Sequence, residues 1–174
     1  MSWFSQLLDL KNRYANPFEM ATDGIMGMNQ RNVNYIGRYN KRKLYPLVDN
    51  KVLTKKIAIS HNVKTPVLIG SVENQHQVQD ILNILGEHTE FCIKPAHGSG
   101  GKGILVIKDK NEATGNYVKT SGQDITKHEL KRHLTNILAG LFSLGGKSDI
   151  ALIEDLIHFD NVFSGYSYDG VPDT

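Results

Sequence analysis

Residues 91–107 read FCIKPAHGSGGKGILVI: an apolar stretch, a glycine-rich stretch and a second apolar stretch. Both apolar stretches are short, and the second is rich in β-branched side chains, which predicts strands at 91–95 and 104–107. The glycine-rich part between them is longer than a tight hairpin requires. We therefore expect a strand–loop–strand flap, with Lys94 on the strand that leads into it.

The composition of this flap suits a polyphosphate ligand. Glycines let the backbone approach a ligand closely at positive φ, so that N–H groups can donate to phosphate oxygens, and Lys94 and Lys102 add positive charge. The match to G-x-G-x-x-G is weak alone, and the strand that follows it excludes a Rossmann or Walker A loop, each of which opens a helix. A glycine-rich hairpin without a ligand is the alternative, but a lysine inside an apolar strand argues against it. The pattern predicts binding of a nucleoside triphosphate.

The residues before the flap predict a helix, a strand and a second helix. Asp49 is expected to cap a helix over 51–61, and Asn62 to end it in a left-handed turn. After Pro66 we expect a strand at 67–69. Gly70 and Ser71 are expected to form a turn and a cap before a helix over 72–85, which Gly86 ends.

The residues after the flap predict a strand, a helix and a last strand. Residues 116–120 suit a strand, and Thr126 and Glu129 form a capping box that starts a helix. The pair at 145–146, two glycines, is expected to stop that helix before a strand over 149–157. With tightly joined central strands, this order predicts an α+β fold with a mixed or antiparallel sheet and flanking helices. Residues 1–48 are expected to hold a short helix near the start, followed by irregular loop after the glycines at 24 and 27.

Composition narrows the class of protein. The 174 residues carry a formal charge of only +2, which argues against a strong nucleic-acid binder, although arginines and tyrosines interleave over 31–45 and keep an RNA-binding alternative open. Cys92 is the single cysteine, so no disulfide forms within the chain, and we expect it to be a buried apolar side chain in a reducing compartment. Without a signal peptide or a membrane-spanning segment, the expected location is the cytoplasm.

The order of these motifs resembles the ATP-grasp superfamily. More narrowly, the lead-in resembles α-L-glutamate-ligase-like proteins, related to the ligase that adds glutamates to a ribosomal protein and grouped with sugar-transfer-associated ATP-grasp proteins. The resemblance is carried by DNKVLTKK (49–56), VKTP (63–66), IKPAHGSGGKGI (93–104) and LIEDLI (152–157), with GIMGMNQRN (24–32) and RYNKRKLYPLVD (38–49) as the lead-in. It implies a lead-in segment at 1–48, the nucleotide-binding first subdomain at 49–157 and the truncated start of a second subdomain at 158–174.

The resemblance implies two ATP lysines, a flap over the phosphates and a hinge that reads the adenine. The first lysine would be Lys51, with Lys55 and Lys56 as rivals, and the second Lys94. The full set that it implies is Lys51, Lys94, His97, Gly98, Ser99, Gly100, Gly101, Lys102, Gly103, Glu154, Asp155, Leu156 and Asp173.

The implied reaction joins a carboxylate to an amine, with glutamate as one candidate partner, through an acyl phosphate formed from ATP with Mg²⁺. The Mg²⁺ ligands and the arginine expected after Asp173 have no match, so they are expected beyond residue 174, and the chain alone is expected to bind ATP without ligation. We assign no metal ligand and no catalytic residue. The alternative is a non-catalytic nucleotide-binding or regulatory module.

Overall fold

The computed structural model describes residues 15–158 and residue 162 of the chain. Two units divide between Pro46 and Leu47, one of residues Met1–Pro46 and one of Leu47–Thr174. The helix expected near the N-terminus and the candidate ATP residue Asp173 lie outside the described residues, as does most of the segment 158–174.

The described part of the first unit is mainly helical, so the prediction of irregular loop after residue 24 is wrong. Its elements are helices α2 (Pro17–Thr22), α3 (Met28–Gln30) and α4 (Gly37–Tyr39), a π-helical stretch (Arg31–Ile36) and a 3₁₀ turn (Arg42–Leu44). No glycine or proline lies between residues 28 and 36, so the two glycines at 24 and 27 flank the helical stretch and do not interrupt it. Gly27 is its N-cap residue.

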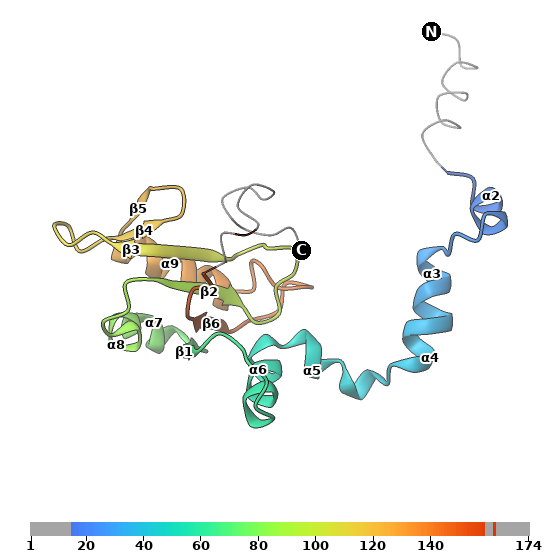
Figure 1. The fold of residues 1–174 in the computed structure, drawn as a ribbon, viewed down its shortest axis with the longest axis horizontal. Coiled ribbons are helices and arrows are strands. Elements are labelled where there is room, and N and C mark those ends of the chain that lie inside the picture. The colour runs from blue at the N-terminus through green and yellow to red at the C-terminus, as the bar shows by residue number, and fades with distance from the viewer. Residues whose placement is uncertain (1–14, 159–161, 163–174) are drawn as a thin grey trace, which may run out of the picture. The chain divides into compact units, whose positions relative to one another are not determined.

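The second unit is an α+β fold, as predicted, and Figure 1 labels its elements. After α5 (Pro46–Asp49), its helices are α6 (Lys51–Ser60), α7 (Gln75–Gln79), α8 (Ile81–Leu85) and α9 (Lys127–Leu138). Its strands are β1 (Leu68–Val72), β2 (Phe91–Pro95), β3 (Leu105–Lys110), β4 (Tyr117–Lys119), β5 (Asp124–Ile125) and β6 (Ala151–Glu154). The strands form one antiparallel sheet in the order β1-β6-β2-β3-β4-β5.

Strand β6 pairs with two strands from the earlier part of the second unit. The last described strand of the chain lies between β1 and β2, with Lys94 opposite Leu152 and Cys92 opposite Glu154. Side chains two residues apart on a strand share a face of the sheet. Lys94 and Glu154 therefore lie on the same face, on neighbouring strands.

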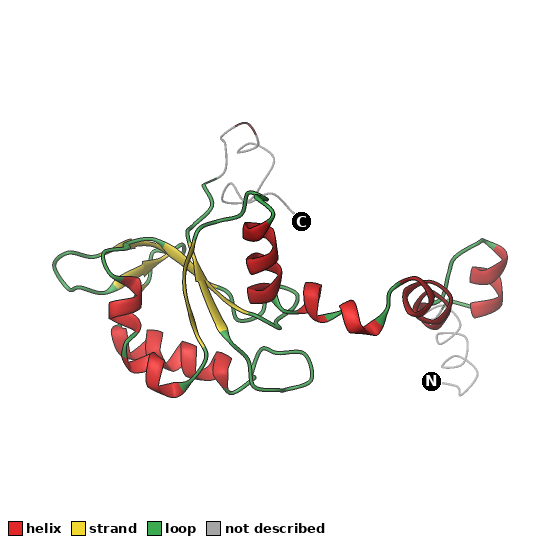
Figure 2. Cartoon of the chain, turned by 90° about the horizontal axis from the view of Figure 1, so that it is seen from below, coloured by secondary structure: helices red, strands yellow, loops and turns green. Residues whose placement is uncertain are grey.

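The two faces of the sheet are covered by different helices (Figure 2). Helices α7, α8 and α9 pack on one face and form the main core, in which the rings of Phe91 and Tyr117 meet edge to face at 5.1 Å. On the other face, α6 contributes Val52 to a smaller cluster with Ala96 and Leu152. The face with fewer apolar contacts is the one that carries Lys94 and Glu154.

Two predicted caps are wrong by a few residues. Asn50, not Asp49, caps α6: its Oδ1 accepts from the N–H groups of Val52 and Leu53, while Asp49 ends α5. Gly70 and Ser71 continue β1 and do not form a turn. A Cβ on Gly70 would lie 2.7 Å from the Ile84 side chain, so this glycine allows α8 to pack close to the strand.

Three further boundaries differ from the prediction. The helix expected over 72–85 is two short helices that meet at Asp80, and Asn74 caps the first. The helix that starts at the predicted capping box of Thr126 and Glu129 ends at Leu138, where Gly140 turns the chain at a φ of 80°. The last strand is shorter than the predicted 149–157. No helix of residues 15–158 has the length and apolar content needed to cross a membrane.

Candidate functional site

The flap between β2 and β3 contains several backbone positions that only glycine adopts easily. Gly100, Gly101 and Gly103 have φ values of 63°, 71° and 78°. Nothing lies within 4 Å of the position of a Cβ at the first two, which leaves the tip of the flap open. Such a backbone can direct N–H groups at an anion, as the sequence predicted.

The C-terminal base of the flap is anchored to α9 and to the loop that follows it. A Cβ on Gly103 would lie 2.5 Å from the ring of Phe142, so the ring packs directly on the backbone. His133 Nε2 lies 3.0 Å from the Gly103 carbonyl oxygen, and burial is the main cause that lowers the pKa of this histidine. A neutral His133 donates its Nε2–H to that carbonyl, which fixes where the flap ends.

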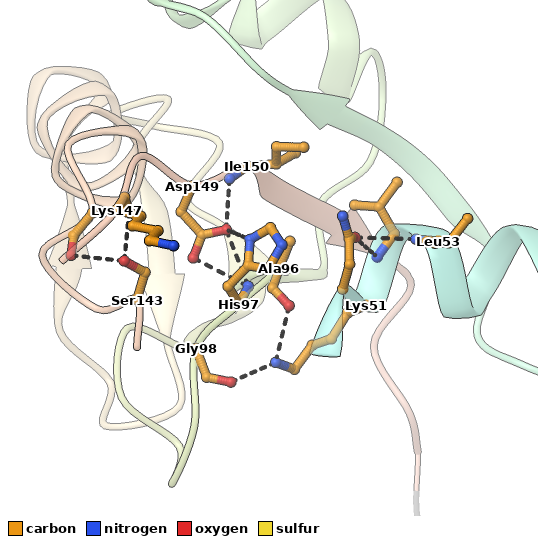
Figure 3. A network of polar contacts seen from close by, with 12 residues as sticks. Lys51, Leu53, Ala96, His97, Gly98, Ser143, Lys147, Asp149 and Ile150 are labelled. Carbon is orange, nitrogen blue, oxygen red and sulfur yellow. Dashed lines mark hydrogen bonds and ion pairs between the residues drawn. The ribbon is translucent and has the colours of Figure 1, made fainter. Parts of the chain in front are cut away.

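The N-terminal base of the flap is held by the first residue of α6 (Figure 3). The Lys51 backbone N–H donates to the Ala96 carbonyl at 3.1 Å, and Lys51 Nζ donates to the carbonyl oxygens of Gly98 at 2.6 Å and Ala96 at 3.3 Å. These acceptors are neutral, so the lysine retains its full positive charge beside the flap. Within the described chain, no carboxylate forms an ion pair with Lys51.

The two rival lysines on α6 occupy different environments. Lys55 is buried, donates to the Pro66 carbonyl and forms an ion pair with Glu154 Oε2 at 2.6 Å. Lys56 is exposed. Of the three, only Lys51 contacts the flap.

Glu154 lies between two cations. Its Oε1 is paired with Lys94 Nζ, and its Oε2 with Lys55 Nζ. Burial raises the pKa of Glu154. The hydrogen bonds from Lys55 and Lys94 and the charges of these lysines together lower it by more, so the pKa lies below its ordinary value. The carboxylate is therefore ionised at neutral pH, and its one negative charge is shared between Lys55 and the partly exposed Lys94.

Cys92 shares this face of the sheet and is inert. Burial raises the pKa of its thiol to about 11; Lys94 opposes this rise and Glu154 adds to it. The thiolate is the reactive form of cysteine. The predicted role as a buried apolar side chain agrees with this environment.

A histidine–aspartate pair fixes the start of the flap. The fully buried Asp149 carboxylate accepts from the His97 backbone N–H at 3.0 and 3.1 Å and lies 2.7 Å from His97 Nδ1. It also accepts from the Ile150 N–H at 2.7 Å (Figure 3). With Nδ1 occupied, Nε2 is the ring atom of His97 that is left for a ligand.

Two cavities adjoin the flap and share part of their walls. A groove of about 80 Å³ runs under it and contains both candidate ATP lysines; its lining is Lys51, Lys94, Pro95, Gly98, Ser99, Gly100, Gly101, Lys102 and Ile104. A larger cavity of about 440 Å³ is lined by Val48, Asp49, Lys51, His97, Gly98, Ser99, Ser143, Leu144, Lys147 and Ser148. Lys51, Gly98 and Ser99 belong to both linings.

The structure thus brings most of the predicted site residues together, but not all. Asp155 and Leu156 line a separate cavity of about 410 Å³ with residues 87–90 and His158. The Asp155 N–H donates to the Val67 carbonyl at 3.0 Å, so it is not available to a ligand in this arrangement.

Several residues around the flap were not predicted from the sequence. They are His133, Phe142, Lys147 and Asp149, whereas Lys55 was named only as a rival for the first ATP lysine. His133, Phe142 and Asp149 contact the flap from positions distant in the chain. Lys55 carries a local signal of its burial, because it lies three residues after the buried Val52 on α6 and so shares its inward face.

The residues present fit a polyphosphate better than a metal ion. The open glycine backbone and the unneutralised Lys51 suit phosphate oxygens. No three acidic, histidine or cysteine side chains of the described residues cluster so that they could hold a metal ion. These described residues therefore offer Mg²⁺ no such set of ligands.

Comparison with known proteins gives a family match. The family model described as sugar-transfer associated ATP-grasp matches residues 30–174. No curated protein and no solved structure matches the chain significantly. The family match covers most of the sequence, and the mixed helices and six-stranded antiparallel sheet are consistent with the first subdomain of the ATP-grasp fold. It supports ATP binding and ATP-dependent, ligase-type function, and the chain belongs to the sugar-transfer associated ATP-grasp family.

Proposed function

We propose that this chain supplies the ATP-binding side of a carboxylate–amine ligase, with glutamate as one substrate. The observation that carries the proposal is the groove under the flap, which brings Lys51 from α6, Lys94 from β2 and Lys102 from the flap to one place. Three lysines around an open glycine backbone suit the charge of a triphosphate.

Each of these groups has a distinct part in binding. Lys51 is already held at the flap by two carbonyls, so little side-chain entropy is lost when it meets a phosphate. Lys94 is paired with Glu154, and a phosphate would have to compete for it. Lys55 stays with Glu154 and keeps that carboxylate neutralised when Lys94 turns to a ligand.

A carboxylate oxygen takes the terminal phosphoryl group of ATP, which releases ADP and gives an acyl phosphate. An amine then displaces inorganic phosphate and forms the amide. The residues of this chain hold the triphosphate, shield it with the flap and stabilise the charge on its oxygens. No protein nucleophile takes part.

Calorimetric titration with ATP tests the binding. We expect Lys94→Met to weaken ATP binding at least tenfold, because a charge-assisted contact to phosphate is lost. The matched control is Lys108→Met, since Lys108 is an exposed lysine of β3 outside the groove, and it should bind as the wild type does. Equal affinity of all three proteins would contradict the assignment of the groove.

A second measurement tests whether the chain alone forms an acyl phosphate. With ATP, Mg²⁺, L-glutamate and hydroxylamine, an acyl phosphate is trapped as a hydroxamate. We expect the 174-residue chain alone to bind ATP without forming hydroxamate. Hydroxamate formation would overturn that expectation and would establish the ligase chemistry.

The partners in this proposal are small-molecule or peptide carboxylates and amines. Neither a nucleic acid nor a membrane is required. The single cysteine has no disulfide partner, which suits the reducing cytoplasm, where ATP is abundant.

A further inference from the structure

The larger cavity beside the flap has a charge pattern that the ATP site does not use. Lys147 lies in its lining on the loop after α9, and Asp49 lies in its lining at the end of α5. Both side chains belong to exposed residues, and neither forms an ion pair within the described part of the chain. The cavity therefore presents a positive and a negative group, each without a charged partner.

Polar groups fill much of the remaining lining. Ser99, Ser143 and Ser148 contribute hydroxyl groups, and His97 contributes the ring whose Nδ1 is held by Asp149. Figure 3 shows the side chains of Lys147 and Lys51 on opposite sides of His97. A ligand here would meet hydrogen-bonding groups as well as charges of both signs.

The cavity is also in the right place for a reactant. Lys51, Gly98 and Ser99 separate it from the groove under the flap and line both spaces. Transfer of a phosphoryl group requires the accepting oxygen to lie next to the terminal phosphate. A carboxylate in the larger cavity would lie beside a triphosphate in the groove, with Lys51 between them.

We propose that this cavity binds the amino-acid substrate, with its carboxylate at Lys147 and Lys51 and its ammonium group at Asp49. The proposal rests on the proposed function, because a ligase of this class needs a carboxylate beside ATP. Its volume of about 440 Å³ is within the usual range for small-molecule sites.

Two-dimensional ¹H–¹⁵N NMR with a pair of probes tests the assignment. L-Glutamate carries two carboxylates and an ammonium group, whereas glutarate has the same chain without the ammonium group. L-Glutamate should shift the amide signals of Ser143, Leu144 and Ser148 saturably. Lys147→Met should weaken both probes at least fivefold, and Asp49→Asn should weaken L-glutamate at least threefold while glutarate binds no more weakly. Lys108→Met is the control and should behave as the wild type does.

The outcomes separate this proposal from the proposed function. If ATP binds to the wild type but neither probe shifts these signals, or if Lys147→Met binds both probes as tightly as the wild type does, the cavity is not the amino-acid site. If inorganic phosphate saturates the same signals and L-glutamate does not move them, the cavity is a phosphate site and the proposal is overturned. If the wild type does not bind ATP, the proposed function itself fails.

Discussion

Two groups of lysines lie within the second unit, and they differ in what surrounds them. Lys55 of α6 and Lys94 of β2 share the buried carboxylate of Glu154 on β6. Beside the flap, Lys51 Nζ donates to carbonyl oxygens, and neither Lys51 nor Lys147 forms an ion pair within residues 15–158. The first two cations share a single negative charge, and the last two have no charged partner within those residues.

This difference separates stability from binding. Removing one member of a buried ion pair leaves the other in a low dielectric without compensation, which costs stability. Removing a cation that has no charged partner changes the stability of the fold little, but it weakens the binding of an anion much more. Substitution of Glu154 should therefore lower stability, whereas substitution of Lys51 should leave stability nearly unchanged and weaken the binding of an anion.

The largest expected effect is on stability, through the ion pairs of Glu154. Glu154→Gln keeps the size of the side chain but leaves the buried Lys55 without a carboxylate, so the free energy of unfolding should fall by about 3 kcal/mol. Urea denaturation measures it. Glu112→Gln removes an exposed carboxylate of the loop after β3 and should change stability by less than about 0.5 kcal/mol. Equal stability of the two variants would show that the ion pairs of Glu154 contribute nothing to the fold.

A smaller effect is expected from the backbone of the flap. Gly103→Ala must adopt a positive φ and also displace the Phe142 ring, so the free energy of unfolding should fall by about 2 kcal/mol. Gly101→Ala has a similar φ but open space around its Cβ, and it should lose about 1 kcal/mol. Thermal unfolding of the pair isolates the contact with Phe142, and a reversed order would contradict it.

The pH dependence of stability should show the smallest effect. The pKa of Glu154 in the folded protein lies below its ordinary value of 4.5, so the contribution of this group is fully present above that pH and is lost as the pH falls through the folded pKa. Urea denaturation at neutral pH and near pH 3.5 should show a smaller loss of stability for Glu154→Gln than for the wild type. The same loss in both proteins would assign the acid sensitivity to other carboxylates.

Local signals in the sequence predicted the elements well where a single residue type sets the geometry. The strand over 91–95 and the capping box of Thr126 and Glu129 were predicted at the residues where they occur. Gly70, by contrast, was wrongly placed in a turn. A glycine is needed there because Ile84 approaches closely when α8 packs on β1, and local sequence does not show this packing.

The sequence predicted the flap and its lysines, but not the surroundings of those lysines. Lys94 was identified from its strand and Lys51 from the resemblance, but their different environments depend on β6. That strand returns between β1 and β2 and puts Glu154 on the face of Lys94, 60 residues away in the chain. Asp149 reaches His97 across 52 residues in the same way. The periodicity of a sequence does not encode such strand order.

The most direct test compares two lysines of α6 by calorimetric titration with ATP. Lys51→Met should weaken ATP binding at least tenfold, about 1.4 kcal/mol, with little change in the free energy of unfolding. Lys56→Met, which removes an exposed lysine of the same helix, should bind ATP as the wild type does. If Lys51→Met and Lys56→Met bind ATP equally well, the cation without a charged partner beside the flap is not an ATP ligand, and the division between the two groups of lysines is wrong.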